Sequence, residues 1–79
     1  MKYLYFSAQW CGPCKSLGPI MNEVSTHIPV QKIDVDKDYE MAQKYGVRNV
    51  PTVVLVNGDS EITRIIGSHS KQRYLDAIK

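Results

Sequence analysis

The sequence has few cysteines, and their spacing excludes a disulfide-stabilised scaffold. Only two of the 79 residues are cysteines, and Cys11 and Cys14 lie three positions apart. A bond that closes so short a loop removes little conformational entropy from the unfolded chain, whereas small disulfide-rich domains use several bonds. The fold must therefore come from an ordinary hydrophobic core, and the cysteine pair must have a different role.

The sequence also lacks long apolar runs and a large net charge. Its longest apolar stretches are four or five residues, far short of the about 20 residues that span a bilayer. Ten Lys and Arg against eight Asp and Glu give a net charge of +2, and the basic residues are scattered. This excludes a nucleic-acid binder and a membrane protein. Because the N-terminus carries no apolar signal region, we expect a cytoplasmic protein. Its length of 79 residues predicts one domain, residues 1–79. We expect this domain to be a monomer.

The spacing of apolar residues predicts seven elements along the chain. The predicted strands span residues 3–8, 30–35, 52–56 and 62–66, and the predicted helices span residues 12–27, 38–46 and 70–78. Asp38 and Ser70 are predicted N-caps of the second and third helices. Asn57-Gly58-Asp59 predicts a hairpin turn. Pro19 is expected to kink the first helix, because it lacks an N–H group.

The element order β-α-β-α-β-β-α predicts an α/β fold with a four-stranded mixed sheet. A helical connection between the first two strands implies parallel pairing with a right-handed crossover. The hairpin adds an antiparallel edge, and the three helices would cover both faces. The apolar share of 43% and the charged share of 23% are close to the average for globular proteins.

The cysteine pair is predicted to lie where the first strand passes into the first helix. Free N–H groups and the helix dipole favour negative charge there, so the pKa of the Cys11 thiol is expected to fall. Gly12 permits a tight turn, and Pro13 fits the first helical turn. Cys14 follows one turn later, within reach of Cys11. This arrangement suits a bond that is made and broken repeatedly.

A structural, metal-binding or inert role for the cysteine pair has less support. A structural disulfide over so short a loop would stabilise little. A zinc site needs about four ligands, whereas there is no second cysteine pair and His27 and His69 are isolated, so no metal is expected. An inert pair of buried residues would not need Gly and Pro between them at a helix start. Dithiol–disulfide exchange is therefore the leading interpretation.

The residues around the pair resemble the active site of the thioredoxin family. The resemblance is carried by Trp10-Cys11-Gly12-Pro13-Cys14-Lys15 and extends to Phe6-Ser7-Ala8-Gln9 before it and Pro19 after it. The segment Tyr45-Gly46-Val47-Arg48-Asn49-Val50-Pro51-Thr52 resembles the family's approach to its cis-proline. Asn57-Gly58 and Gly67 resemble the hairpin and the end of the last strand. The resemblance covers nearly the whole chain and implies a thioredoxin-like fold.

The resemblance implies a thiol–disulfide oxidoreductase that reduces protein disulfides. Cys11 would be the exposed attacking thiolate and Cys14 the more buried resolving thiol, with a mixed disulfide as the intermediate. Electrons would be carried by the cysteines, so no cofactor is expected. The implied partners are disulfide-containing protein substrates and a thioredoxin-reductase-type flavoenzyme as the electron donor.

The resemblance also assigns roles to residues around the cysteines. The predicted catalytic set comprises Cys11, Cys14, Trp10, Gly12, Pro13, Pro51, Lys32 and Tyr5. Trp10 would flank the site, and Pro51 in the cis form would pack beside it, turning the backbone so that Val50 can pair with an extended substrate. The predicted apolar docking surface comprises Val50, Gly46, Val47, Ile66 and Gly67.

Two features depart from the family pattern. The strand and helix that usually precede the first strand are missing, so the chain is expected to be a minimal core. Tyr5 occupies the position of a buried Asp that assists proton transfer together with a lysine, which Lys32 matches. We expect Tyr5 to fill the core and to donate a hydrogen bond toward Cys14 or a water. We expect the Lys32 ammonium to reach solvent, and Asp34 is a weak substitute for the missing acid.

Functions other than thioredoxin-like reduction are less well supported by the sequence. A glutaredoxin-like enzyme reduced by glutathione is the alternative, and the small size favours it. Gly12-Pro13 and Pro51-Thr52 disfavour it, and Gly67-Ser68 matches only part of a Gly-Gly-Asp segment for the glutathione carboxylates. An oxidant or isomerase role stays open, because the residues between the cysteines tune the redox potential. The intact cysteine pair disfavours a binding scaffold without turnover.

Overall fold

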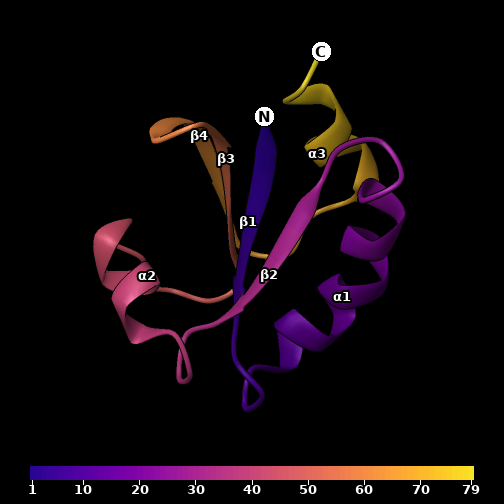
Figure 1. Ribbon diagram of the computed structural model, residues 1–79. Coiled ribbons are helices and arrows are strands. Elements are labelled where there is room, and N and C mark those ends of the chain that lie inside the picture. The colour runs from indigo at the N-terminus through magenta and orange to yellow at the C-terminus, as the bar shows by residue number, and fades with distance from the viewer.

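The computed structural model describes all 79 residues as four strands and three helices (Figure 1). In chain order these are β1 (Lys2–Ser7), α1 (Gly12–Val24), β2 (Val30–Asp34), α2 (Tyr39–Lys44), β3 (Thr52–Asn57), β4 (Ser60–Ile66) and α3 (Lys71–Asp76). The predicted element order is confirmed. None of the helices has the length and apolar character needed to span a membrane.

The strands form one mixed sheet in the order β2-β1-β3-β4. β1 runs parallel to β2 and antiparallel to β3, and β3 runs antiparallel to β4. The predicted parallel unit and hairpin edge are therefore both present. The two central strands are buried on both faces, which explains why they are apolar runs with little alternation.

Helices cover both faces of the sheet, as predicted. Figure 1 shows α1 and α3 on one side and α2 on the other. Successive residues of β1 alternate between the two cores, because side chains of a strand point to opposite faces. Tyr3 and Tyr5 pack in the core beneath α1 and α3. Leu4 and Phe6 pack in the core beneath α2, together with Ala42.

Helix α1 ends at Val24, three residues earlier than predicted. The hydroxyl groups of Ser25 and Thr26 donate hydrogen bonds to the carbonyls of Asn22 and Glu23. Such side-chain bonds compete with the helical backbone pattern, so the chain leaves the helix in a turn. Pro19 lies inside α1, and the kink expected there stays a prediction.

The remaining boundaries differ from the predicted ones by at most two residues, and the starts of β4 and α3 show why. β4 begins at Ser60, two residues earlier than predicted, because Asn57 pairs with Ser60 across a two-residue turn in which Gly58 has a φ of 63°. Ser70 occupies the N-cap position of α3, but its side chain makes no capping hydrogen bond, so that prediction is wrong in its mechanism. Asp38 does cap α2, accepting a hydrogen bond from the Met41 N–H.

Candidate active site

Cys11 and Cys14 are joined by a disulfide at the start of α1, with their Cα atoms 5.3 Å apart. β1 ends at Ser7, and Cys11 is the N-cap of α1 with extended backbone angles. Pro13 lies in the first helical turn, where its missing N–H leaves no hydrogen bond unmade. The short connection from a buried strand to a helix therefore fixes both sulfur atoms at the end of the sheet.

The backbone directs a hydrogen bond at the sulfur of Cys11. The Cys14 N–H donates to Cys11 Sγ over 3.2 Å, so this sulfur serves as the capping acceptor of the helix. The first turn of α1 contains no acidic residue that would oppose a negative charge there. A sulfur in this position is well placed to carry negative charge when the disulfide is reduced.

The exposure of the two cysteines differs from the prediction. The family resemblance implies an exposed Cys11 and a more buried Cys14, but their exposed fractions are 5% and 4%. Cys11 lies in a small apolar cluster with Ala8 and Cys14, against which Val35 and Val50 pack. In the disulfide form the two sulfurs are thus distinguished by their position in the helix rather than by exposure.

The chain preceding β3 lies against the cysteine pair. Cys11 Sγ is 3.6 Å from the carbonyl oxygen of Val50, and the Val50–Pro51 peptide bond is cis. Val50 is half-buried, and Pro51 is buried. The tertiary fold thus brings together two motifs that lie about 40 residues apart in the sequence.

A hollow of about 270 Å³ lies beside this contact. It is lined by Trp10, Val35, Val47, Arg48, Asn49 and Val50. Two of the five predicted docking residues, Val47 and Val50, therefore line one concave surface next to Trp10. Gly46, Ile66 and Gly67 lie outside it: Ile66 is 55% exposed, and the Gly67 N–H donates to the Pro51 carbonyl over 2.9 Å.

Trp10 is fixed by a contact that the sequence did not predict. Its ring is 71% exposed, yet its Nε1–H donates to Asp36 Oδ2 over 2.9 Å. Asp36 lies in the loop after β2, 26 positions away in the sequence. No local pattern marks this pairing, because it depends on how two loops meet at one end of the sheet.

Tyr5 lies directly beneath the start of α1. Its side chain is 3% exposed, and its hydroxyl donates a hydrogen bond of 2.6 Å to the backbone carbonyl of Cys14. The predicted contact with Cys14 is therefore confirmed, with the carbonyl as acceptor. Burial raises the pKa of Tyr5 above its usual value, and the Ser7 hydroxyl partly offsets this. Tyr5 consequently remains a protonated donor at neutral pH.

A second hollow, of about 660 Å³, lies on the side of the cysteine pair where Tyr5 is found. Its lining includes Tyr5, Cys14, Lys32 and Asp34. Lys32 is exposed, as expected, and forms no ion pair with Asp34. Asp34 Oδ1 accepts a hydrogen bond from the Asp36 N–H. No cluster of three or more His, Cys, Asp or Glu residues could hold a metal ion.

The whole chain is similar to known thioredoxins. A family model described as thioredoxin matches residues 2–79. Thioredoxin from Rickettsia bellii is 38% identical in an alignment of 78 positions that covers 92% of this chain and 73% of that protein. A bifunctional thioredoxin reductase/thioredoxin from Mycobacterium leprae is 38% identical in an alignment of 74 positions that covers 89% of this chain and 16% of that longer protein.

Solved structures agree with the sequence comparisons. A mutant thioredoxin from Halobacterium salinarum has a TM-score of 0.90 and 35% identity, covering 98% of this chain and 70% of that one. Thioredoxin from Nicotiana alata has a TM-score of 0.89 and 36% identity, covering 98% of this chain and 69% of that one. The predicted thioredoxin-like α/β fold is therefore confirmed for this chain, which spans about 70% of these two proteins.

Proposed function

The chain belongs to the thioredoxin family and is a thiol–disulfide oxidoreductase, and from this premise we propose that it reduces protein disulfides with Cys11 as the attacking thiolate. One observation supports this role above the others: Cys11 Sγ is the N-cap acceptor of α1 and faces the Val50 carbonyl. The helix terminus stabilises the thiolate, and the neighbouring loop offers backbone groups to a bound chain.

The proposed reaction has two exchanges. The Cys11 thiolate attacks one sulfur of the substrate disulfide, forming a mixed disulfide and releasing the other substrate sulfur as a thiolate. Cys14, deprotonated, then attacks Cys11 Sγ, which releases the second substrate thiolate and forms the Cys11–Cys14 bond. Two electrons pass to the substrate, whose thiolates take up protons from solvent. The cysteines supply these electrons, so the proposal includes no cofactor and no metal.

The neighbouring residues support these steps. We assign Trp10 and Pro51 to the rim that receives the substrate, Val50 to pairing with an extended segment, and Gly12 and Pro13 to the turn that starts α1. Val47 and Val50 line the hollow beside Trp10, which supports their assignment to docking. Gly46, Ile66 and Gly67 lie outside this hollow, and we assign them to the surface that flanks it, since Gly46 precedes Val47 and the Gly67 N–H donates to the Pro51 carbonyl.

Tyr5 and Lys32 are assigned to the resolving cysteine rather than to the substrate. The hydroxyl of Tyr5 holds the Cys14 carbonyl over 2.6 Å, which supports a positioning role in the second exchange. Lys32 lines the hollow that also contains Cys14. This shared lining supports its assignment to the resolving side of the site.

The oxidised pair must be reduced again, and we propose a thioredoxin-reductase-type flavoenzyme as the donor. The Mycobacterium leprae relative, whose name joins a reductase to a thioredoxin, supports this choice. We further propose that the 79 residues act as one monomeric domain in the cytoplasm, where thiols are kept reduced. The radius of gyration of 11.4 Å agrees with a single compact body of this length.

One coupled assay tests the proposal. Insulin serves as the disulfide substrate, and electrons are supplied either by a thioredoxin reductase with NADPH or by glutathione with its own reductase. We expect turnover with the thioredoxin reductase. Turnover with glutathione alone would support the glutaredoxin-like alternative and contradict the proposed donor.

The assignment of the two cysteines is tested by a trapping experiment. Cys14→Ser is expected to abolish turnover and to accumulate a mixed disulfide between Cys11 and the substrate, because the second exchange cannot occur. Cys11→Ser is the matched control and should trap nothing. Mass spectrometry of the adduct identifies the bonded cysteine. Trapping at Cys14 in the Cys11→Ser variant would reverse the assigned roles.

A further inference from the structure

The segment from Gly46 to Pro51 carries most of the proposed docking surface, and its end near β3 is firmly attached. The Thr52 hydroxyl donates to the Asn49 carbonyl over 2.6 Å. The Gly67 N–H donates to the Pro51 carbonyl over 2.9 Å. The position of the docking loop therefore depends on how its other end, at the C-terminus of α2, is held.

The C-terminal end of α2 is closed by a Schellman motif. The Gly46 N–H donates to the Gln43 carbonyl over 3.1 Å, and the Val47 N–H donates to the Ala42 carbonyl over 2.9 Å. Gly46 has a φ of 63°, as this motif requires. The motif leaves the Tyr45 carbonyl free to accept a hydrogen bond from another element.

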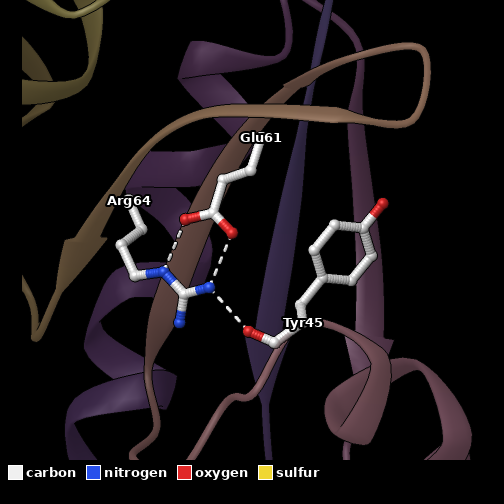
Figure 2. Close-up of polar contacts among 3 residues, drawn as sticks. All are labelled: Tyr45, Glu61 and Arg64. Carbon is white, nitrogen blue, oxygen red and sulfur yellow. Dashed lines mark hydrogen bonds and ion pairs between the residues drawn. The ribbon is translucent and has the colours of Figure 1, made fainter.

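Arg64 on the edge strand β4 provides that hydrogen bond. Figure 2 shows its guanidinium between Glu61 and the backbone of Tyr45. Arg64 Nη2 donates to the Tyr45 carbonyl over 2.6 Å and to Glu61 Oε1 over 2.7 Å, and Arg64 Nε donates to Glu61 Oε2 over 2.7 Å. The bidentate pair with Glu61 fixes the plane of the guanidinium, so that Nη2 points at Tyr45.

A β-bulge makes this geometry possible. Glu61 pairs with Val56 and Arg64 pairs with Val54, while a register shift leaves Ile62 as the extra residue of β4. Val54 and Val56 both face the core beneath α2, so Glu61 and Arg64 lie on that face although they are three residues apart. In a regular strand, residues three apart would point to opposite faces.

We propose that Arg64, held by Glu61, is a positioning residue that sets the substrate-docking loop by hydrogen bonding to the Tyr45 carbonyl. This inference rests on the proposed function and assigns a determinant of protein-substrate recognition to a strand outside the cysteine site. The bond immediately precedes Gly46, so its loss allows Gly46, Val47 and Arg48 to shift relative to Cys11, whereas the end from Asn49 to Pro51 stays attached. Chemistry at the sulfurs is untouched, because Arg64 contacts neither cysteine.

The proposal predicts a difference between substrate classes. A protein disulfide is presented on an extended segment that needs the docking loop, whereas a small chromogenic aryl disulfide needs only access to Cys11. The test uses the pre-reduced protein mixed rapidly with insulin or with the aryl disulfide. The fluorescence of Trp10, the only tryptophan, reports the oxidation of the cysteine pair.

Arg64→Met keeps an apolar side chain of similar length and removes both sets of hydrogen bonds. We expect the half-saturating insulin concentration to rise about tenfold, the effect of losing one hydrogen bond from a charged donor. The limiting rate with insulin and the rate with the aryl disulfide are expected to stay unchanged. Arg64→Lys should recover part of the insulin affinity, because its ammonium can still reach one acceptor.

Arg73→Met is the matched control, since Arg73 is exposed on α3 and forms no ion pair. Hydrogen exchange gives a second measurement: the Gly46 and Val47 amides should exchange faster in Arg64→Met, while the Val54 amide in the sheet should not. Unchanged insulin affinity in Arg64→Met, or an equal loss with both substrates, overturns the inference. Failure of the unaltered protein to reduce either disulfide would instead contradict the proposed function.

Discussion

At the residue scale, Tyr5 shows how this chain departs from its family. A tyrosine fills the position where an acid is expected, and its hydroxyl is used to hold the Cys14 carbonyl. Because burial raises the pKa of Tyr5, this side chain donates a hydrogen bond at neutral pH and does not accept a proton. The contribution that we propose for Tyr5 in the second exchange is therefore positional.

Replacing Tyr5 by Phe tests this role. The ring is retained and the Cys14 carbonyl loses a buried donor, so the free energy of unfolding should fall by about 1 kcal/mol. Urea denaturation measures this change. The pH profile of insulin reduction should stay as in the parent, because Tyr5 does not titrate near neutral pH.

Tyr5→Asp is the contrasting variant. It places a titratable carboxyl group beside Cys14, and the pH profile of reduction should therefore shift. An equal shift of the profile in Tyr5→Phe would contradict a purely positional role of the hydroxyl. No shift in Tyr5→Asp would contradict the expectation that a carboxyl group at position 5 acts on Cys14.

At the element scale, the end of α2 sets the start of the proposed docking loop. The helix stops because Gly46 adopts a φ of 63°, and the Schellman hydrogen bonds follow from that conformation. A Cβ atom at Gly46 would meet no atom within 4 Å. The requirement for glycine is therefore conformational, since there is room for a side chain.

Gly46→Ala is expected to lower the free energy of unfolding by about 1 kcal/mol, the cost of a left-handed conformation for an L-residue with a Cβ atom. Gly46→Asn is the matched control and should lose less, because Asn tolerates this conformation. Thermal and urea denaturation of both variants measure the difference. Equal losses would show that space, and not φ, selects glycine here.

The start of α1 is the other element boundary that matters. Cys11 takes the N-cap position that Ser, Thr, Asp or Asn usually occupies, and its sulfur accepts the Cys14 N–H. The capping atom of the helix is thus also the proposed nucleophile. The stability of the helix start and the charge on the sulfur are consequently coupled.

At the scale of the whole molecule, buried tyrosines connect the sheet to the helices. Tyr3 donates to the Tyr74 carbonyl over 2.6 Å, and Tyr74 donates to the Gly67 carbonyl over 3.3 Å. The rings of Tyr3 and Tyr74 meet edge to face, with centroids 6.2 Å apart. Burial raises the pKa of Tyr3, of Tyr5 and of Tyr74.

These raised pKa values predict alkaline instability. The unfolded chain ionises its tyrosines near pH 10.0, whereas the folded chain holds these three protonated to higher pH. The contribution of these three tyrosines to the free energy of unfolding is therefore complete below about pH 10. It is lost progressively as the pH rises above this value. Urea denaturation at pH 8 and near pH 11 should show this loss, with tyrosinate absorbance appearing together with unfolding.

Tyr3→Phe should reduce this loss of stability at high pH, because it removes one of the three tyrosines with a raised pKa. Tyr39 is 65% exposed, so Tyr39→Phe is the matched control and should leave the loss in place. If ionisation of all the tyrosines preceded unfolding, the linkage between burial and alkaline stability would be contradicted.

The sequence by itself determined the element order, the fold class and the cysteine chemistry. These follow from local information: apolar periodicity, the Asn57-Gly58 turn, and a cysteine pair at a predicted helix start. Element boundaries are less well determined, as α1 shows, because the hydroxyls of Ser25 and Thr26 compete with the helix in a way that periodicity does not reveal.

Only the tertiary structure decided which distant residues act together. It placed the Val50 carbonyl against Cys11, Asp36 against Trp10 and Arg64 against the Tyr45 carbonyl. It also buried Cys11, for which the family resemblance implies exposure. Side-chain direction in these contacts depends on loop paths and on the bulge at Ile62. Local sequence patterns carry no record of such packing, because its energy comes from residues that meet only when the sheet has formed.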